Sequence, residues 1–346
     1  MINIDSYYEI INFLDSSNST LYSCIQVSKE FVRITILILY ANPWKYEKRL
    51  KDHKFWPLFT RTFLSSLPAT LKHILVSKNV EINKISLNKD TIFNYTAYTK
   101  YITNWSISQI SFEIFKKCIK KKYYIGESFL PPIQRELYLL FILNCKRIVY
   151  FEMPEVDIFD KTIDFIYINK FSLNLLECSS YYKPEVFTSL SKYCRNIQHI
   201  IINLYEKDNP GLAQLILRQN SLKIIELRLS LYQSSGKFNL LSQALLNLNS
   251  LQSICFEEFI SINITCMQYL CRNSLKELKL NLTTSLISLV EFEMLLQISF
   301  DKLERIVICS NITYDISYYL KEFIKRTTNN LKIIQWNLLF FNDTNI

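Results

Sequence analysis

Residues 196–229 read NIQHIIINLYEKDNPGLAQLILRQNSLKIIELRL, and this stretch decides the fold. Apolar residues stand at a start position and three and five residues after it, first from Ile197 and again, 25 residues later, from Leu222. The residues three and five positions after the start share one side of a β-strand, because side chains alternate along a strand with a period of two. Residues 211–219, between the two clusters, are predicted to form a helix. The stretch therefore predicts strand, helix and strand in succession.

The same pattern recurs along more than half of the chain, at intervals of 24 to 29 residues. Its start positions, numbered 0, are Ile148, Leu173, Ile197, Leu222, Leu251, Leu275, Leu303 and Leu331. Every residue at positions 0, +3 and +5 is apolar. Helices are predicted between the strands at residues 185–195, 211–219, 239–248, 265–272, 289–298 and 317–326. One strand–helix unit cannot bury its own apolar side, but a stack of them can. Residues 147–346 are thus predicted to form an α/β leucine-rich-repeat solenoid of about eight repeats.

An ordinary doubly wound α/β domain is the alternative fold. It would need longer apolar strands and glycines at the turns that lead from strand to helix. The chain contains only 3 glycines in 346 residues. The repeat is therefore the favoured interpretation.

Positions +4 and +6 of each strand are expected to point away from the core, onto the concave face of the solenoid. We expect a protein substrate to bind this face. The residues predicted to contact it are Glu152, Glu177, Ile201, Glu226, Arg228, Cys255, Glu257, Lys279 and Gln335. Acidic residues in the first half of the set hint at a basic segment in the partner.

The first 46 residues are predicted to form three short helices. Tyr7, Ile10, Ile11 and Leu14 have the spacing of one helix face, and a polar break follows at residues 15–19. Further apolar stretches begin at Leu21 and run from residue 33 to 40. So short a segment cannot hide this much apolar surface alone, so part of it should meet a partner or the following region. Residues 47–146 are predicted to be a helical bridging and capping region.

The segments EIINFLD (9–15), STLYSCIQVSKEFVRI (19–34) and ANPWKY (41–46) resemble an F-box. They are similar to the F-box of a large family of fungal F-box proteins that carry leucine-rich repeats. In that family the segment typically reads as an acidic residue before IFEYL, then TLHSCLLVNRLW. The matching residues are Glu9, Ile10, Leu14, Thr20, Leu21, Ser23, Cys24, Val27 and Trp44. Two positions depart from it: Ile2-Asn3 replaces the opening Leu-Pro, and Phe31 replaces a tryptophan.

The resemblance implies an adaptor of a cullin–RING (SCF-type) ubiquitin ligase. Its F-box would dock on the Skp-type linker, and its repeats would hold a substrate protein for ubiquitination and turnover. The residues expected at the linker are Tyr7, Ile10, Ile11, Leu14, Leu21, Cys24, Val27, Ser28 and Phe31. The alternative is an interaction or scaffold solenoid whose degenerate F-box serves only as a helical cap.

Other functional classes find little support. Nucleophilic catalysis needs Ser or Cys near His and a carboxylate; the chain has 3 His and 9 Cys without close CxxC spacing. We therefore expect no enzyme, no metal site and no cofactor. A nucleic-acid binder is the least favoured hypothesis. It would use the run Lys116, Lys117, Lys120, Lys121 and Lys122. No apolar run could span a bilayer and no signal peptide is evident, so no membrane partner and a cytoplasmic or nuclear location are expected.

Overall fold

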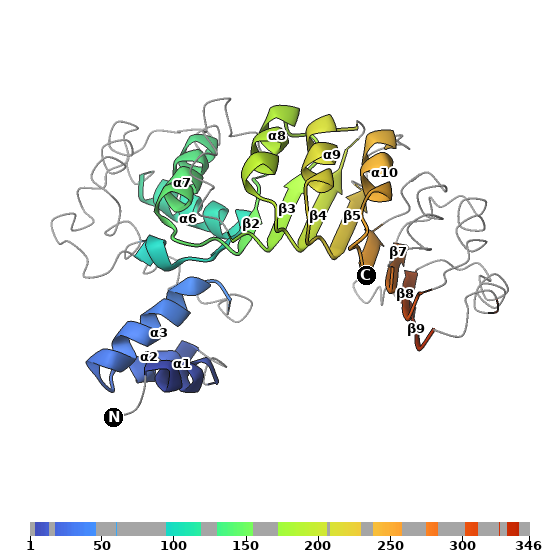
Figure 1. Ribbon diagram of the computed structural model, residues 1–346. Coiled ribbons are helices and arrows are strands. Elements are labelled where there is room, and N and C mark those ends of the chain that lie inside the picture. The colour runs from blue at the N-terminus through green and yellow to red at the C-terminus, as the bar shows by residue number, and fades with distance from the viewer. Residues whose placement is uncertain are drawn as a thin grey trace, which may run out of the picture. The chain divides into compact units, whose positions relative to one another are not determined.

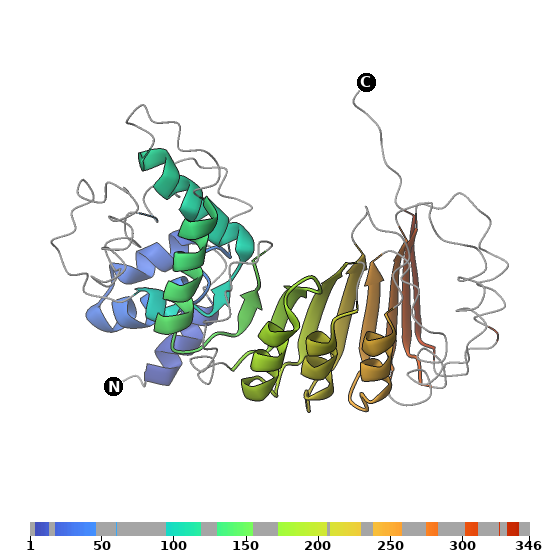
Figure 2. The same ribbon diagram turned by 90° about the horizontal axis from the view of Figure 1, so that it is seen from above.

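The computed structural model describes residues 4–13, 18–45, 60, 95–118, 130–154, 172–205, 208–229, 238–257, 275–282, 302–310, 325 and 331–338. The chain divides into two compact units (Figures 1 and 2). Unit 1 comprises residues 1–160 and 170–172, and unit 2 comprises residues 161–169 and 173–346. The described helices and strands make this an α/β protein. None of those helices has the length and apolarity needed to cross a bilayer.

Unit 1 begins with three helices: α1 (Ile4–Phe13), α2 (Asn18–Ile25) and α3 (Lys29–Ala41). Both α1 and α2 contact α3. Their shared core consists of Ile11, Leu21, Ile34 and Leu39. The Ser28 hydroxyl accepts a hydrogen bond from the backbone N–H of Phe31, which fixes the start of α3. The predicted three short helices in this segment are confirmed.

The rest of unit 1 contains a 3-10 turn, η3 (Tyr95–Tyr98), the strands β1 (Tyr101–Ile102) and β2 (Tyr150–Glu152), and the helices α6 (Asn104–Cys118) and α7 (Leu130–Asn144). Strands β1 and β2 pair in parallel. The indole N–H of Trp44 donates to the carbonyl of Tyr101 at 2.9 Å, and the N–H of Lys100 donates to the carbonyl of Ala41. These bonds join the segment after α3 to β1.

The described residues of unit 2 form seven strands: β3 (Leu175–Ser179), β4 (His199–Leu204), β5 (Ile224–Leu229), β6 (Ser253–Glu257), β7 (Glu277–Leu282), β8 (Arg305–Ser310) and β9 (Ile333–Leu338). They pair in parallel and in chain order. Helices α8 (Pro184–Tyr193), α9 (Pro210–Leu217) and α10 (Asn239–Leu246) lie side by side on one face of the sheet (Figures 1 and 2). They confirm three predicted helices. The other three predictions, 265–272, 289–298 and 317–326, lie outside the described residues except for Lys325.

The register places equivalent repeat positions opposite each other on all seven strands. Leu176, Ile200 and Ile225, all at position +3, are aligned, and the alignment continues to Ile334. From Ile148 to Ile308, every residue at positions 0, +3 and +5 is at most 4% exposed. The predicted apolar face is therefore confirmed up to β8. On β9, Ile334 is 48% exposed.

A repeated hydrogen bond lies just ahead of each strand. The backbone carbonyl at position +1 accepts two N–H donors from the next strand, as when Gln198 accepts from Lys223 and Ile224 at 2.9 and 3.0 Å. The same arrangement is made by Asn174, Lys223, Gln252, Lys276 and Glu304. In unit 1, Lys100 accepts from Val149 and Tyr150 in the same way. Strand β1 therefore has the geometry of a further repeat that starts at Thr99. The apolar pattern of the sequence does not predict this repeat, because Thr99 is polar and position +5 is Asn104, the first residue of α6.

Two buried amide side chains hold the corners of adjacent strand–helix units together. Asn209 caps α9 by accepting from the N–H of Leu212, and it donates to the carbonyls of Ser180 and Tyr182. At the other end of α9, Gln219 accepts from the N–H of Ile197 and donates to the carbonyls of Cys194 and Leu215. Each amide therefore satisfies backbone groups of two successive units.

Replacing Asn209 by alanine is expected to destabilise unit 2. The change removes the cap of α9 and leaves two buried carbonyls without their donor, which we expect to cost about 1.5 kcal/mol. Urea unfolding followed by circular dichroism would measure the loss. Asn247→Ala, which removes an exposed amide bonded only to the carbonyl of Gln243, is the matched control. Equal effects of the two substitutions would contradict the role given to Asn209.

Candidate binding surfaces

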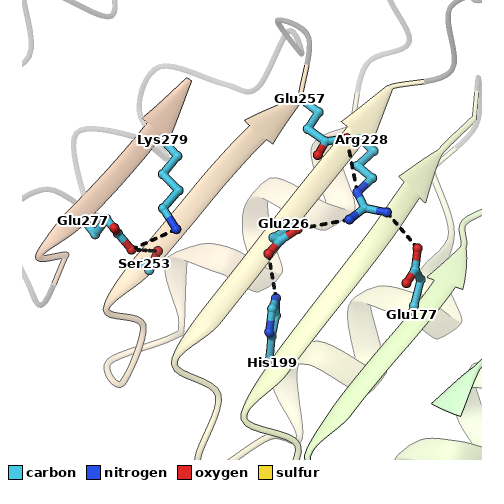
Figure 3. A network of polar contacts seen from close by, with 8 residues as sticks. All are labelled: Glu177, His199, Glu226, Arg228, Ser253, Glu257, Glu277 and Lys279. Carbon is cyan, nitrogen blue, oxygen red and sulfur yellow. Dashed lines mark hydrogen bonds and ion pairs between the residues drawn. The ribbon is translucent and has the colours of Figure 1, made fainter. Parts of the chain in front are cut away.

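The sheet face of unit 2 that lies opposite the helices carries the side chains at positions +2, +4 and +6 (Figure 3). The sequence pattern predicts positions +4 and +6 on this face, and the register adds position +2. Polar residues at +2 are His199, Ser253, Glu277 and Arg305. The period of two in a strand was the signal that could have found them. We call this surface the open sheet face.

Arg228 is the centre of the largest polar cluster on the open sheet face (Figure 3). Its guanidinium lies 2.7 Å from Glu177 on β3 and 3.3 Å from Glu226 on β5. Its Nε atom lies 3.2 Å from Glu257 on β6, at ion-pair distance but without hydrogen-bond alignment. One cation thus links three strands through three carboxylates. Burial lowers the pKa of Arg228, but the carboxylates outweigh it and leave that pKa raised.

Glu226 also contacts a histidine on the neighbouring strand. The Nε2 atom of His199 lies 3.0 Å from Oε1 of Glu226. This contact, against the opposing effect of partial burial and with a further contribution from Arg228, lowers the pKa of Glu226 below its ordinary value. Glu226 is therefore held as a carboxylate on the open sheet face.

A second polar cluster surrounds Glu277 on β7. The Ser253 hydroxyl donates to its Oε2 at 2.8 Å, and Lys279 lies 3.4 Å from the same oxygen. Arg305 lies 3.4 Å from Oε1 and also donates to the side-chain oxygen of Gln335 at 3.2 Å. The charges on β7 and β8 therefore form a ladder from strand to strand.

The structure separates the predicted substrate residues. Glu177, Glu226, Arg228 and Glu257 come together around Arg228, and Lys279 and Gln335 belong to the Glu277 ladder. Cys255 is half-buried between the two clusters, and Ile201 is almost fully buried. Glu152 belongs to unit 1, where it accepts from the N–H of Asn104 at the start of α6.

The structure shows how the acidic residues behind the predicted basic partner are paired. Of the acidic residues in the first half of the face, Glu177 and Glu226 are both paired with Arg228, as is Glu257 on β6. The guanidinium partly neutralises those carboxylates, so they offer a cationic partner less attraction than their number suggests.

Three of the free thiols among the described residues of unit 2, those of Cys178, Cys194 and Cys255, have little tendency to ionise. Burial raises the pKa of Cys178 and raises the pKa of Cys194 to about 12. Burial and the nearby Glu226 and Glu257 likewise raise the pKa of Cys255 to about 12. These thiols are protonated at neutral pH and are poor nucleophiles. Among the described residues, no group of three or more His, Cys, Asp or Glu has the geometry of a metal site.

The nine residues predicted to contact the linker differ in exposure. Ile10 and Val27 are exposed, at 46% and 66%, and Tyr7 and Phe31 are half-buried in edge-to-face contact at 5.0 Å. Ile11, Leu21 and Cys24 are corrected to core residues, because packing of the three helices covers their side chains. The hydroxyl of Ser28 caps α3, and Leu14 lies outside the described residues. Phe13, which the apolar spacing of the sequence does not mark, is 88% exposed.

The lysine run is described only at its beginning. Lys116 pairs with Glu113 at 2.9 Å and lies 4.5 Å from the centre of the Phe112 ring. Lys120, Lys121 and Lys122 lie outside the described residues.

Comparison of the chain with protein-family models and with curated proteins finds no match.

Proposed function

We propose that this protein is a non-catalytic substrate adaptor of a cullin–RING (SCF-type) ubiquitin ligase. Helices α1 to α3 act as an F-box that docks on the Skp-type linker. Unit 2 acts as a leucine-rich-repeat solenoid that holds a substrate protein. The ligase then works by proximity, because the complex raises the effective concentration of substrate lysines near the activated ubiquitin carrier.

The repeat in unit 2 supports the solenoid half of the proposal. The same apolar positions are buried from one strand to the next, and the same double hydrogen bond precedes each strand. Stacked units of this kind present a broad face to macromolecules. The open sheet face provides such a surface, with charged and polar side chains on adjacent strands.

Exposed apolar side chains on α1 carry the F-box half of the proposal. Ile10 and Phe13 are three residues apart on the helix and therefore share a face. Val27, in the turn between α2 and α3, is a third exposed apolar residue. Large apolar side chains exposed together are typical of protein interaction sites. With Tyr7 and Phe31 half-buried, these residues form the linker face that we propose.

Binding of the purified chain to the Skp-type linker tests the proposal. The double variant Ile10→Asp, Phe13→Asp is expected to weaken binding at least about a hundredfold, because it places charges at the centre of an apolar contact. The measurement is isothermal titration calorimetry, with circular dichroism to verify folding. Gln243→Asp, Gln252→Asp adds the same charge at exposed polar positions of unit 2 and should bind normally. A folded wild-type chain that does not bind the linker would rule out the ligase role.

The alternative is a scaffold solenoid in which α1 to α3 only cap the first unit. Two observations favour it: Ile11, Leu21 and Cys24 are buried within the helices, and Trp44 is hydrogen-bonded to Tyr101. The linker experiment separates the two functions. For either, we propose a cytoplasmic or nuclear location, supported by the free thiols of the described cysteines.

A further inference from the structure

The edge of unit 2 at which the strands begin is strongly basic. All strands of this unit are parallel and in register, so their first residues lie along one edge, and each described helix ends there too. We define the strand-start edge as the described residues from the last helical turn, or the loop before a strand, to position +1. Its cations are Lys192, Arg195, Arg218, Lys223, Lys276, Lys302 and Lys332, all exposed. Among the described residues of this edge, Glu304 is the one carboxylate.

Charge is distributed differently at the other end of the strands. There the described residues include Lys183 together with Glu185 and Asp208, so both signs are present. The basic character is therefore specific to the strand-start edge.

Local interactions account for only some of these cations. Lys192 and Arg218 stand at helix C-termini, where positive charge is favourable. Lys223, Lys276 and Lys332 stand at position +1, immediately before their strands. Within the described part of the chain, no ion pair neutralises Arg195, Arg218 or Lys223. This arrangement leaves a row of cations facing solvent.

Glu304 shows which anion the row can hold. Its carboxylate lies 2.9 Å from Nζ of Lys332 on one side and 3.7 Å from Nζ of Lys276 on the other. A carboxylate can therefore bridge lysines from strands on either side of β8. The pKa of Glu304 is lowered by Lys332 and, to a smaller extent, by Lys276, as expected for a favourable site for negative charge.

We propose that the strand-start edge binds an acidic polypeptide segment, with the carboxylates of Asp and Glu placed between neighbouring Lys and Arg side chains. The row from β4 to β9 covers five strand spacings of about 4.8 Å, or about 24 Å in total. An extended segment of about seven residues has this length. Single-stranded nucleic acid is less well suited, because it usually needs exposed aromatic rings for base stacking. The described edge contains one aromatic residue, Tyr193, which is half-buried.

The surface is distinct from the linker face on α1 and does not require the ligase function. Within that function, it would place an acidic segment of the substrate along unit 2. A failure of linker binding and a failure of this proposal are therefore seen in separate experiments, since each uses a different ligand and different residues.

Binding of a labelled peptide of alternating Glu and Ser, about ten residues long, tests the proposal by fluorescence anisotropy. The full chain is expected to bind it at about 30 mM salt and to lose most of that binding at about 300 mM, because salt screens exposed charges. The triple variant Arg195→Glu, Arg218→Glu, Lys223→Glu should weaken binding at least about tenfold, through both lost attraction and new repulsion.

The matched control reverses three exposed cations elsewhere and changes the net charge equally: Lys29→Glu, Arg33→Glu, Lys183→Glu. It should bind the peptide within about twofold of the wild type, because none of these three residues belongs to the strand-start edge. Three results would overturn the proposal: no peptide binding at low salt, equal loss in both triple variants, or tighter binding of a single-stranded or duplex oligonucleotide that depends on the same three cations.

Discussion

Replacing Gly211 by alanine is expected to lower the free energy of unfolding by about 3 kcal/mol, because overpacking against rigid backbone is costly. Gly211 is the second residue of α9, after Pro210. A Cβ atom there would lie 2.0 Å from the carbonyl oxygen of Pro184 and 2.7 Å from its carbonyl carbon, at the start of α8. Both atoms belong to the backbone, so no side-chain rotation relieves the clash.

The sign of the effect distinguishes this constraint from helix propensity. Propensity alone predicts that alanine is better than glycine in a helix by up to about 1 kcal/mol. Urea unfolding of Gly211→Ala and wild type measures the difference. Gln243→Ala, at an exposed position of α10, should change stability by less than about 0.5 kcal/mol. If Gly211→Ala were as stable as the wild type, α9 could move away from α8 and the close approach would not be required.

Replacing Arg228 by methionine should lower the free energy of unfolding by about 2.5 kcal/mol at pH 7. This loss is smaller than that expected for a fully buried ion pair, because the cluster is partly exposed to solvent. Methionine keeps much of the side-chain volume but leaves Glu177, Glu226 and Glu257 without the cation that they share. Their mutual repulsion then acts across β3, β5 and β6. Denaturant unfolding at pH 7 measures the loss.

The cost of Arg228→Met should depend on pH in a defined direction. The pKa of Glu226 is lowered in the folded state from the ordinary value of 4.5, chiefly by His199 and further by Arg228. A lowered pKa contributes stability that is fully present above pH 4.5 and is lost as the pH falls through the folded-state value. The difference between variant and wild type should therefore shrink in acid.

Arg305→Met is the matched control for the Arg228 substitution. Arg305 is more exposed and has one carboxylate partner, Glu277, so its replacement should cost less than about 1 kcal/mol. A cost for Arg228→Met that does not change between pH 7 and pH 3 would contradict the electrostatic origin of the effect.

The strands of unit 2 and their buried positions could be predicted because their signal is local and repeated. Ile197, Ile200 and Ile202 are buried on one side of β4 for the reason that their spacing indicated, and Leu222, Ile225 and Leu227 repeat the pattern on β5. The two-residue strand β1 escaped detection because Ile102 alone carries its apolar signal.

The candidate surfaces were harder to predict because they depend on distances between strands. Arg228 and Glu177 are 51 residues apart in the chain, and only the register of β3, β4 and β5 brings their charges to 2.7 Å. In the same way, spacing within α1 marked Ile10 and Ile11 alike, but packing against α3 buried Ile11 and left Ile10 exposed.

By itself, the sequence determined which residues alternate between core and surface, since a strand has a period of two and apolar side chains leave water. It thereby determined where the strands of unit 2 lie in the chain and where helices α8, α9 and α10 lie between them. Tertiary structure alone decided which surface charges pair, that Gly211 must approach Pro184, and that exposed cations from separate repeats line one edge. The physical reason is that burial follows from local periodicity, whereas ion pairs and close contacts depend on the stacking of residues that are about 25 or more positions apart.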